Sequence, residues 1–276
     1  MVNKLWCREL ARKWYQSSWE PPHPRSLSEP RCEDRVRLWY LLYRYFMLAL
    51  WLTIVICSVF EIGSSQPTST GQLIKWPIYL TNWDLSFGLA QALLGAYLVM
   101  RRWRLQRSDP TFEPSSGLSY GRSERFYWFC YVITSSLALS VSGTYWALVH
   151  DPRIHRIDAL NLMVHVGNSL LIVTDTLVTR VPMVMGNFWW CPVVVTGYLT
   201  FNYVYYALGG LDKRGFHYIY SVIDWDRPAR ALAYCSLGLS SLVVAHCLMY
   251  FVASMRDRNF RRHEDKLTER KTENCV

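Results

Sequence analysis

Residues 39–60 read WYLLYRYFMLALWLTIVICSVF, and this stretch decides the class of fold. It contains a single charged residue, Arg44. The hydrocarbon core of a bilayer is about 30 Å thick, and a helix needs about 20 apolar residues to cross it. Because the stretch is continuously apolar and lacks the alternation of a β-barrel strand, it predicts a transmembrane helix.

Further stretches of similar length and apolar character lie downstream, at residues 79–100, 126–149, 159–179, 189–208 and 231–253. Charged residues make up only 18% of the chain, whereas a soluble domain has about a quarter. They gather between the apolar stretches. We therefore expect an all-α integral membrane protein, a bundle of six transmembrane helices. The pattern excludes a disordered chain, a secreted disulfide-built domain and a nucleic-acid-binding protein, despite the formal net charge of +9.

The distribution of Lys and Arg predicts the orientation of these spans. If the N-terminus is cytoplasmic, the cytoplasmic segments hold 22 basic residues and the outside loops hold 7. Cytoplasmic loops are enriched in Lys and Arg, so both termini are expected in the cytoplasm. The expected organisation is a cytoplasmic N-terminal segment at 1–38, a six-helix transmembrane domain at 39–253 and a cytoplasmic tail at 254–276.

The segments outside the membrane carry weaker signals. Residues 3–15 have the spacing of a short interfacial helix, and an ordinary loose terminus explains them equally well. The prolines that follow predict a linker, and these are Pro21, Pro22, Pro24 and Pro30. The tail after Met255 is highly charged and is expected to end in disorder.

Two of the spans carry polar residues at helical spacing. In the second span, one face of the helix is formed by Thr81, Asp84, Gly88, Gln91 and Gly95. In the fourth span, one face is formed by Asn161, His165, Asn168, Ile172, Asp175 and Thr179. Small residues at Gly88, Ala92 and Ala96 predict close helix packing. Polar groups inside a membrane are costly and therefore functional candidates, but many of them only join helices.

Three polar residues are expected at similar depth in the outer half of the bilayer, namely Thr81, His165 and Asn202. His165 lies six residues, or about 9 Å, inside its span. With His165 as general base, the Thr81 hydroxyl can serve as a nucleophile. Asn202, Asn161 or a backbone N–H can stabilise an oxyanion, and Asp84 can orient the imidazole.

The remaining polar residues have simpler interpretations. Asn168 supports the polar face of the fourth span, and Asp175 near its inner end is expected to pair with Arg180 or to face water. Arg44 is expected to extend to the inner interface, and His246 to be a hydrogen-bonded packing residue. There is no metal-ligand spacing, glycine-rich phosphate loop or G-x-S-x-G motif, so we expect neither a metal nor a cofactor.

The chain resembles the rolling stone family of insect membrane proteins over nearly its whole length. The resemblance is carried by residues 1–7 (MVNKLWC), residues 161–165 (NLMVH) and residues 202–210. It implies a multi-pass protein of the plasma membrane with a role in myoblast fusion during muscle formation. It also implies membrane lipids and membrane proteins of the fusion machinery as partners.

The spans are also similar, more distantly, to the androgen-induced membrane hydrolases that cleave fatty-acid esters of hydroxy fatty acids. Residues 79–84 (YLTNWD) resemble the threonine motif of those enzymes. Asn161, His165 and Asp175 resemble their histidine helix, although Leu162 stands where they carry a further His. The resemblance implies the nucleophile and base roles already considered for this Thr and His.

Three functions therefore stay open. The first is a non-enzymatic role in cell–cell fusion, and the second is the hydrolysis of lipid esters. The two are compatible if editing of lipids supports fusion. The third, a transporter lined by the polar faces, is disfavoured because paired spans lack the Gly and Pro breaks of unwound helices.

Overall fold

The computed structural model describes residues 24–31, 33–109, 111–112, 121–151 and 157–273, with side chains up to residue 258. Over these residues the structure is all-helical. The α-helices are α2 (Leu38–Phe60), α3 (Leu80–Ser108), α4 (Arg122–Thr144), α5 (Ala159–Leu162), α6 (Asn168–Val178), α7 (Trp190–Ala207) and α8 (Pro228–Glu273). Single turns of 3-10 helix are η1 (Pro24–Leu27) and η5 (Met185–Trp189), with a longer one at η2 (Thr70–Ile78). Two turns are π-helical, η3 (Tyr145–Val149) and η4 (Met163–Gly167).

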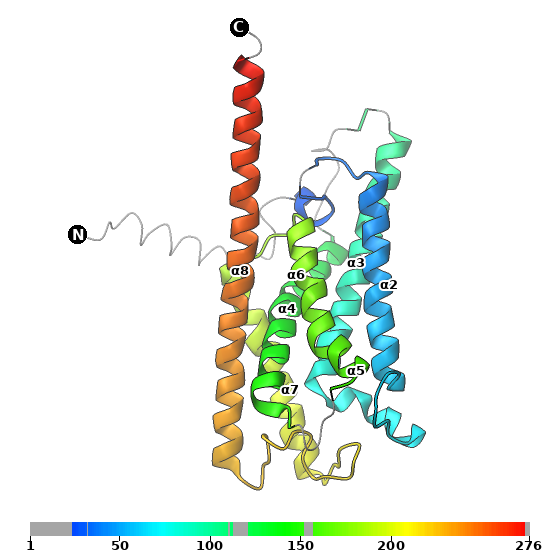
Figure 1. Ribbon diagram of the computed structural model, residues 1–276, viewed down its shortest axis with the longest axis vertical. Coiled ribbons are helices and arrows are strands. Elements are labelled where there is room, and N and C mark those ends of the chain that lie inside the picture. Colours follow the sequence, from blue (N-terminus) through cyan, green and yellow to red (C-terminus); the bar gives the residue numbers. More distant parts are fainter. Residues whose placement is uncertain (1–23, 32, 110, 113–120, 152–156, 274–276) are drawn as a thin grey trace, which may run out of the picture.

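The long helices run side by side along the longest axis of the molecule (Figure 1). Within the described residues, the helices long and apolar enough to cross a membrane number five, and they are Leu38–Phe60, Leu80–Ser108, Arg122–Val149, Ala159–Val178 and Pro228–Arg258. The start of α2 and the end of α8 lie at the same end of the bundle, uppermost in Figure 1. The chain is therefore an all-helical, multi-pass membrane protein, as its apolar stretches predict.

The fifth predicted span, 189–208, corresponds to α7. This helix has 18 residues, or about 27 Å at 1.5 Å per residue. It is not among the helices that qualify as spans by length and composition. It runs beside α4 and α8 (Figure 1). The count of six spans thus stays a prediction.

The charged tail does not have the expected disorder. Helix α8 continues without interruption to Glu273 and projects beyond the rest of the bundle in Figure 1. Residues 256–273 are rich in Arg, Lys and Glu, which are strong helix formers. They extend a helix that packing in the bundle has already nucleated, so the initiation cost is absent.

The proline-rich linker is also different from the expectation, at least from Pro24 onward. Pro24 begins η1, and Pro30 forms a β-bridge with Thr179 just after α6. The backbone N–H of Arg31 donates to the carbonyl of Val178 at 3.0 Å. This segment therefore packs across the upper end of the helices. Residues 3–15 and the first two prolines lie outside the described residues.

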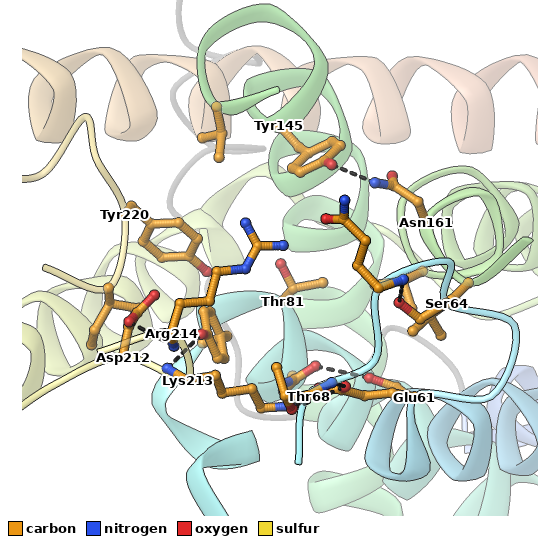
Figure 2. A pocket seen from close by; sticks show the side chains of 18 of the residues that line it. Glu61, Ser64, Thr68, Thr81, Tyr145, Asn161, Asp212, Lys213, Arg214 and Tyr220 are labelled. Atoms are coloured by element: carbon orange, nitrogen blue, oxygen red, sulfur yellow. Dashed lines mark hydrogen bonds and ion pairs between the residues drawn. The ribbon is translucent and has the colours of Figure 1, made fainter. Parts of the chain in front are cut away.

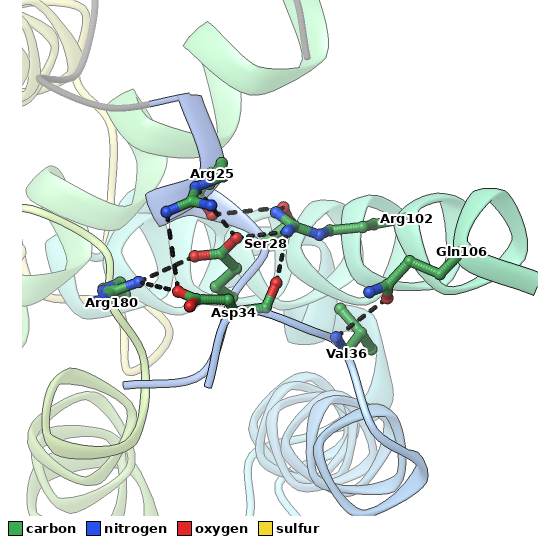
Figure 3. Close-up of polar contacts among 8 residues, drawn as sticks. Arg25, Ser28, Asp34, Val36, Arg102, Gln106 and Arg180 are labelled. Carbon is green, nitrogen blue, oxygen red and sulfur yellow. Dashed lines mark hydrogen bonds and ion pairs between the residues drawn. The ribbon is translucent and has the colours of Figure 1, made fainter. Parts of the chain in front are cut away.

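A buried carboxylate fastens this segment to the bundle (Figure 3). Glu29 is fully buried and pairs with Arg102 of α3, and with Arg180 at 3.0 Å. Arg25 lies 3.5 Å from the same carboxylate. Burial raises the pKa of Glu29, although Arg102 and Arg25 oppose the shift. Arg180 thus forms its ion pair with Glu29, and the expected pairing of Arg180 with Asp175 is wrong.

An arginine from α8 caps the end of α6 in the same region. Arg256 is buried, and its Nη1 donates to the carbonyls of Thr176, Thr179 and Val181 at 2.9, 3.0 and 3.1 Å. The last carbonyls of a helix have no partner within the helix. The guanidinium therefore satisfies groups that would otherwise be buried without hydrogen bonds.

A second fully buried ion pair joins α2 and α6 inside the bundle. Arg44 Nη1 of α2 lies 2.7 Å from Asp175 Oδ1 of α6, and the two side chains are 2% and 1% exposed. Tyr43 donates to the same carboxylate oxygen at 3.1 Å, and Arg44 Nη2 donates to the Tyr127 hydroxyl of α4 at 3.0 Å. Arg44 therefore does not extend to the interface as expected. A partner inside the bundle holds it, since an unpaired buried charge is far more costly.

Two glycines of α3 make room for large side chains of α2. A Cβ at Gly95 would lie 1.7 Å from Arg44 Nη2, and a Cβ at Gly88 would lie 2.2 Å from the ring of Trp51. Both glycines belong to the polar face predicted for the second span. Their lack of a side chain lets α2 and α3 approach closely, in the manner of small-residue contacts between membrane helices.

We expect Gly95→Ala to destabilise the protein. The new methyl group displaces the Arg44 guanidinium, and breaking a buried ion pair costs about 3–5 kcal/mol. Gly143→Ala in α4 is the matched control, because nothing lies within 4 Å of that Cβ position and Ala favours a helix over Gly by about 1 kcal/mol. Thermal unfolding in detergent should give a lower melting temperature for Gly95→Ala and an equal or higher one for Gly143→Ala. Equal melting temperatures for both variants would contradict this role of Gly95.

Candidate functional site

The structure has a cavity of about 300 Å³ at the lower end of the bundle in Figure 1. The end of α2, the start of α3, the two π-helical turns and the loop 212–221 enclose it. Among the seven residues proposed from the sequence, this cavity is lined by Thr81, Asn161 and His165. Hydroxyl, carboxamide and imidazole groups from two spans, α3 and the helix Ala159–Val178, therefore share one space.

Thr81 lies in the first turn of α3, where the helix begins after the extended residue Tyr79. The Tyr220 hydroxyl accepts the N–H of Leu80 at 3.0 Å and also interacts with the Thr81 side chain. The first N–H groups of a helix lack partners within it, so Tyr220 acts as a cap. Figure 2 shows Tyr220 beside Thr81 at the cavity wall. This cap holds the first turn of α3 so that Thr81 lines the cavity at this end of the bundle.

His165 lies on the π-helical turn η4 and stacks on Tyr145 of the π-helical turn η3. The ring centroids are 3.6 Å apart, and the ring planes differ by 6°. The Tyr145 hydroxyl in turn accepts a hydrogen bond from the Asn161 carboxamide (Figure 2). π-Helical turns are rare and frequently occur at functional sites. Here they turn two side chains of different helices face to face.

Tyr145 and Tyr220 are site residues that the sequence did not single out. Both are tyrosines among 18 in the chain. Tyr145 lies near the end of an apolar stretch, where aromatic residues are expected in any membrane protein, and Tyr220 lies in the loop between α7 and α8. Nothing in their spacing marks them. Asn82 also lines the cavity. The sequence could have indicated this residue, because it directly follows Thr81.

The other proposed residues lie elsewhere. Asp84 and Asn168 are fully buried one turn deeper, and the Asn168 carboxamide donates to Asp84 Oδ2 at 3.0 Å. Asp84 thus contacts Asn168, and no contact with His165 is found among the described residues. Asp175 belongs to the ion pair with Arg44 near the opposite end.

Asn202 is also absent from the residues that line the cavity. Its Oδ1 accepts the indole N–H of Trp225 at 2.8 Å, and its Nδ2 lies 3.5 Å from the Tyr198 hydroxyl. Asn202 therefore fastens the loop before α8 to α7. Of the two asparagines considered from the sequence for an oxyanion, Asn161 lines the cavity and Asn202 does not.

The loops at the lower end of the bundle in Figure 1 close over the cavity through an ion pair. Lys213 Nζ lies 2.6 Å from Glu61 Oε1, and Glu61 also accepts from the Thr68 backbone at 2.5 Å. Lys75 donates to the carbonyl of Asp212 at 2.9 Å. Burial raises the pKa of Glu61, but the hydrogen bonds from Lys213 and Thr68 outweigh it and hold this pKa below its ordinary value. We call Glu61 and Lys213 the loop clamp.

A second cavity, of about 100 Å³, lies among α4, α7 and α8. It shares four lining residues with the first, namely Thr81, Tyr145, Val149 and Tyr220. Its other walls are mostly aliphatic, with side chains such as Leu137, Val141, Val195, Leu199 and Leu242. The proposed nucleophile therefore stands where a polar space meets an apolar one.

One group of side chains in the described residues has the composition of a metal site. His217, Asp224 and Asp226 offer ligand atoms within 4.8 Å of one another. His217 Nε2 lies 3.1 and 3.0 Å from the two carboxylates. Contacts between the imidazole and the carboxylates account for this geometry without an ion. His217 and Asp226 are exposed and Asp224 is partly buried on the loop before α8, and none of the three lines the cavity of Thr81.

Comparison with known proteins agrees with the resemblance seen in the sequence. The model of the family described as "Protein rolling stone" matches residues 3–267. The chain belongs to the rolling stone family. The Drosophila melanogaster protein rolling stone is 26% identical over 260 residues, which cover 90% of this chain and 84% of the fly protein. No solved structure matches the chain, so the cavity and its clamp have no structural precedent in this comparison.

The loop clamp makes the outer end sensitive to acid. Because the pKa of folded Glu61 is below the ordinary value of 4.5, its carboxylate stabilises the folded loops above that value and loses this effect as the pH falls through the folded pKa. We expect amide hydrogen exchange in residues 61–69 to accelerate in that range, after correction for the intrinsic pH dependence of exchange. Lys213→Gln should show faster exchange already at pH 7 and a smaller response to acid. An unchanged response in Lys213→Gln would contradict the role of the clamp.

Proposed function

We propose that this chain is a plasma-membrane protein that supports the fusion of myoblasts during muscle formation. Membership of the rolling stone family supports this proposal. The proposed topology has six spans, α7 included, and both termini in the cytoplasm. Two observations support that topology. Basic residues are concentrated in the segments assigned to the cytoplasm, and the start of α2 lies at the same end of the bundle as the end of α8 (Figure 1).

Fusion of two bilayers is opposed by hydration of the headgroups and by exposure of acyl chains to water. The outer loops of this chain are short, spanning residues 61–79, 150–158 and 208–227 between helices. They offer little surface for binding an opposing cell. The proposed contribution is therefore made within one membrane, by organising partner proteins or by changing the local lipid.

The fusion role is tested by deletion and rescue. In cultured myoblasts that lack this chain, we expect fewer multinucleated cells, and re-expression of the wild-type chain should restore them. The measurement is the fraction of nuclei in multinucleated cells. Fusion that proceeds normally without the chain would overturn the proposal.

Delivery and topology are controlled in the same cells with single cysteines. A membrane-impermeant maleimide should react with Arg227→Cys on intact cells, because that residue lies exposed on the loop before α8. Arg104→Cys, exposed at the other end of α3, should react only after permeabilisation. The reverse pattern would invert the proposed topology.

The cavity favours a second candidate function, the hydrolysis of lipid esters. The observation that carries this candidate is that Thr81, His165 and Asn161 line one cavity, and that this cavity adjoins an apolar one. In this proposal His165 accepts the hydroxyl proton as the Thr81 oxygen attacks the ester carbonyl, and Asn161 donates to the developing oxyanion. The alcohol leaves with the proton from His165. Water then hydrolyses the acyl-threonine with the same base.

A fluorophosphonate probe tests this candidate directly. We expect the probe to label the protein in membranes and Thr81→Ala to abolish labelling. Thr53→Ala is the matched control, since Thr53 faces outward on α2 and bonds only its own helix at Ala49. Absent labelling of a properly delivered wild-type chain, or equal labelling of both variants, would remove Thr81 as a nucleophile. Rescue of fusion by Thr81→Ala would then separate fusion from this chemistry.

A further inference from the structure

The two cavities at the outer end have complementary chemistry. The larger is lined by side chains that form hydrogen bonds, including Ser58, Thr68 and Asn161, and the smaller by aliphatic ones. They adjoin at Thr81 and Tyr145. Binding sites for small molecules are mostly apolar, with a few placed polar groups. Two adjoining spaces of this kind fit one amphiphile, with its headgroup in the first and its chain in the second.

The acidic residues of the larger cavity already have donors. Glu61 is paired with Lys213. Asp158 caps the start of α5 by accepting the Asn161 N–H at 2.9 Å, and it accepts the Ser65 N–H at 2.7 Å. Asp212 accepts the backbone N–H groups of its own loop, at residues 214 and 216. These carboxylates are therefore occupied in holding the walls together.

Arg214 is the cation whose position points to the charge of the headgroup. It lines the larger cavity, and its guanidinium lies between Thr81 and Tyr145 in Figure 2. Its charge acts on the Tyr145 hydroxyl, and therefore on the junction with the apolar cavity. A guanidinium has five N–H donors and can serve several acceptors at once. Its planar fork matches a carboxylate or a phosphate.

We propose that the two cavities form a binding site for a single-chain lipid with an anionic headgroup. Arg214 binds the carboxylate or phosphate, and the first methylene groups lie in the apolar cavity beside Leu199. The remaining chain continues toward the bilayer between α7 and α8. One acyl chain is proposed because the apolar cavity of about 100 Å³ has room for only a short length of one. Membrane lipid is the source that this chemistry and location favour.

The inference rests on the hydrolase candidate and deepens it by naming the class of lipid that the same site binds, either as an ester substrate or as a released fatty acid. Binding and turnover are nevertheless separable. Thr81→Ala removes the hydroxyl that hydrolysis requires but leaves Arg214 and the aliphatic wall in place. If Thr81→Ala still binds the lipid but no longer reacts with the fluorophosphonate, both proposals are supported. If the wild-type chain does not bind the anionic lipid, the lipid-site proposal alone is refuted.

The test is photocrosslinking of the full chain in lipid nanodiscs. Three single-chain probes share one diazirine-bearing acyl chain and differ in headgroup: a free carboxylate, a glycerol phosphate and an uncharged glycerol. We expect the two anionic probes to crosslink at least about tenfold more strongly than the uncharged one, as the loss of a charge-assisted hydrogen bond implies. Equal crosslinking of all three would overturn the assignment of Arg214 to the headgroup.

Variants then locate the site. Arg214→Gln should lower crosslinking of both anionic probes about tenfold and leave the uncharged probe unchanged, while Arg214→Lys retains part of the preference. Arg227→Gln, on the exposed loop outside both cavities, is the matched control and should behave as wild type. An equal effect of the two Gln variants would show attraction by overall charge and would refute the site.

The apolar cavity is tested in the same assay. Leu199→Trp fills it and should reduce crosslinking of all three probes, whereas Val193→Trp, 70% exposed on the same helix, should not. Melting temperatures equal to that of the wild type establish that each variant folds. Folded Leu199→Trp with undiminished crosslinking would exclude this cavity as the chain site, and the Arg214 variants decide the headgroup site even if Leu199→Trp fails to fold.

Discussion

The ion pair between Arg44 and Asp175 is the constraint around which the bundle is arranged. Two charges removed from water are tolerated only when their geometry is good and their remaining hydrogen bonds are satisfied. The pair approaches this condition by drawing on three helices, with Tyr43 from α2, Tyr127 from α4 and the carboxylate from α6. Arg44 Nε and Asp175 Oδ2 are the two atoms of the pair that have no hydrogen bond within the described residues. Helix α3 packs beside the ion pair, and a side chain at position 95 would collide with the Arg44 guanidinium. Gly95 leaves the space that the guanidinium occupies.

The same logic explains the arrangement of charges at the upper end. Glu29 gathers arginines from its own segment, from α3 and from the segment after α6, and Arg256 of α8 caps α6. The contacts of Arg102, Arg180 and Arg256 join parts of the chain that are distant in sequence. Together they hold α3, α6 and α8 to one another at the end of the bundle opposite the cavity.

The lower end shows how a bundle gains a site without a separate domain. Regular helices would place Tyr145 and His165 according to a uniform 100° rotation per residue. The π-helical turns at η3 and η4 change that rotation locally and stack the two rings. The short outer loops then need only one ion pair and a few hydrogen bonds to cover the space. For a member of the rolling stone family, this cavity is a chemical feature that the fusion role does not by itself require. It links the two proposed functions, since a protein that binds or edits one lipid also changes the membrane in which fusion takes place.

The amino-acid sequence by itself determined the class of fold. Continuous apolar stretches such as residues 39–60 can satisfy their backbone groups in lipid only as helices. The sequence also determined that the small residues of the second span permit close packing, and that Thr81, Asn161 and His165 share one end of the bundle, because helical rise converts position into depth.

Only the tertiary structure decided which polar groups meet. Asp84 and Asp175 lie on the same faces as the cavity residues, yet they bind Asn168 and Arg44, and Asn202 turns to Trp225. Spacing reports the face of a helix and the depth of a residue, but it does not report the neighbour across the interface. That neighbour depends on helix rotation, on glycines that admit a large side chain and on local π-turns. These are set by packing among segments that lie far apart in the sequence, as Arg44 and Asp175 do with a separation of 131 residues.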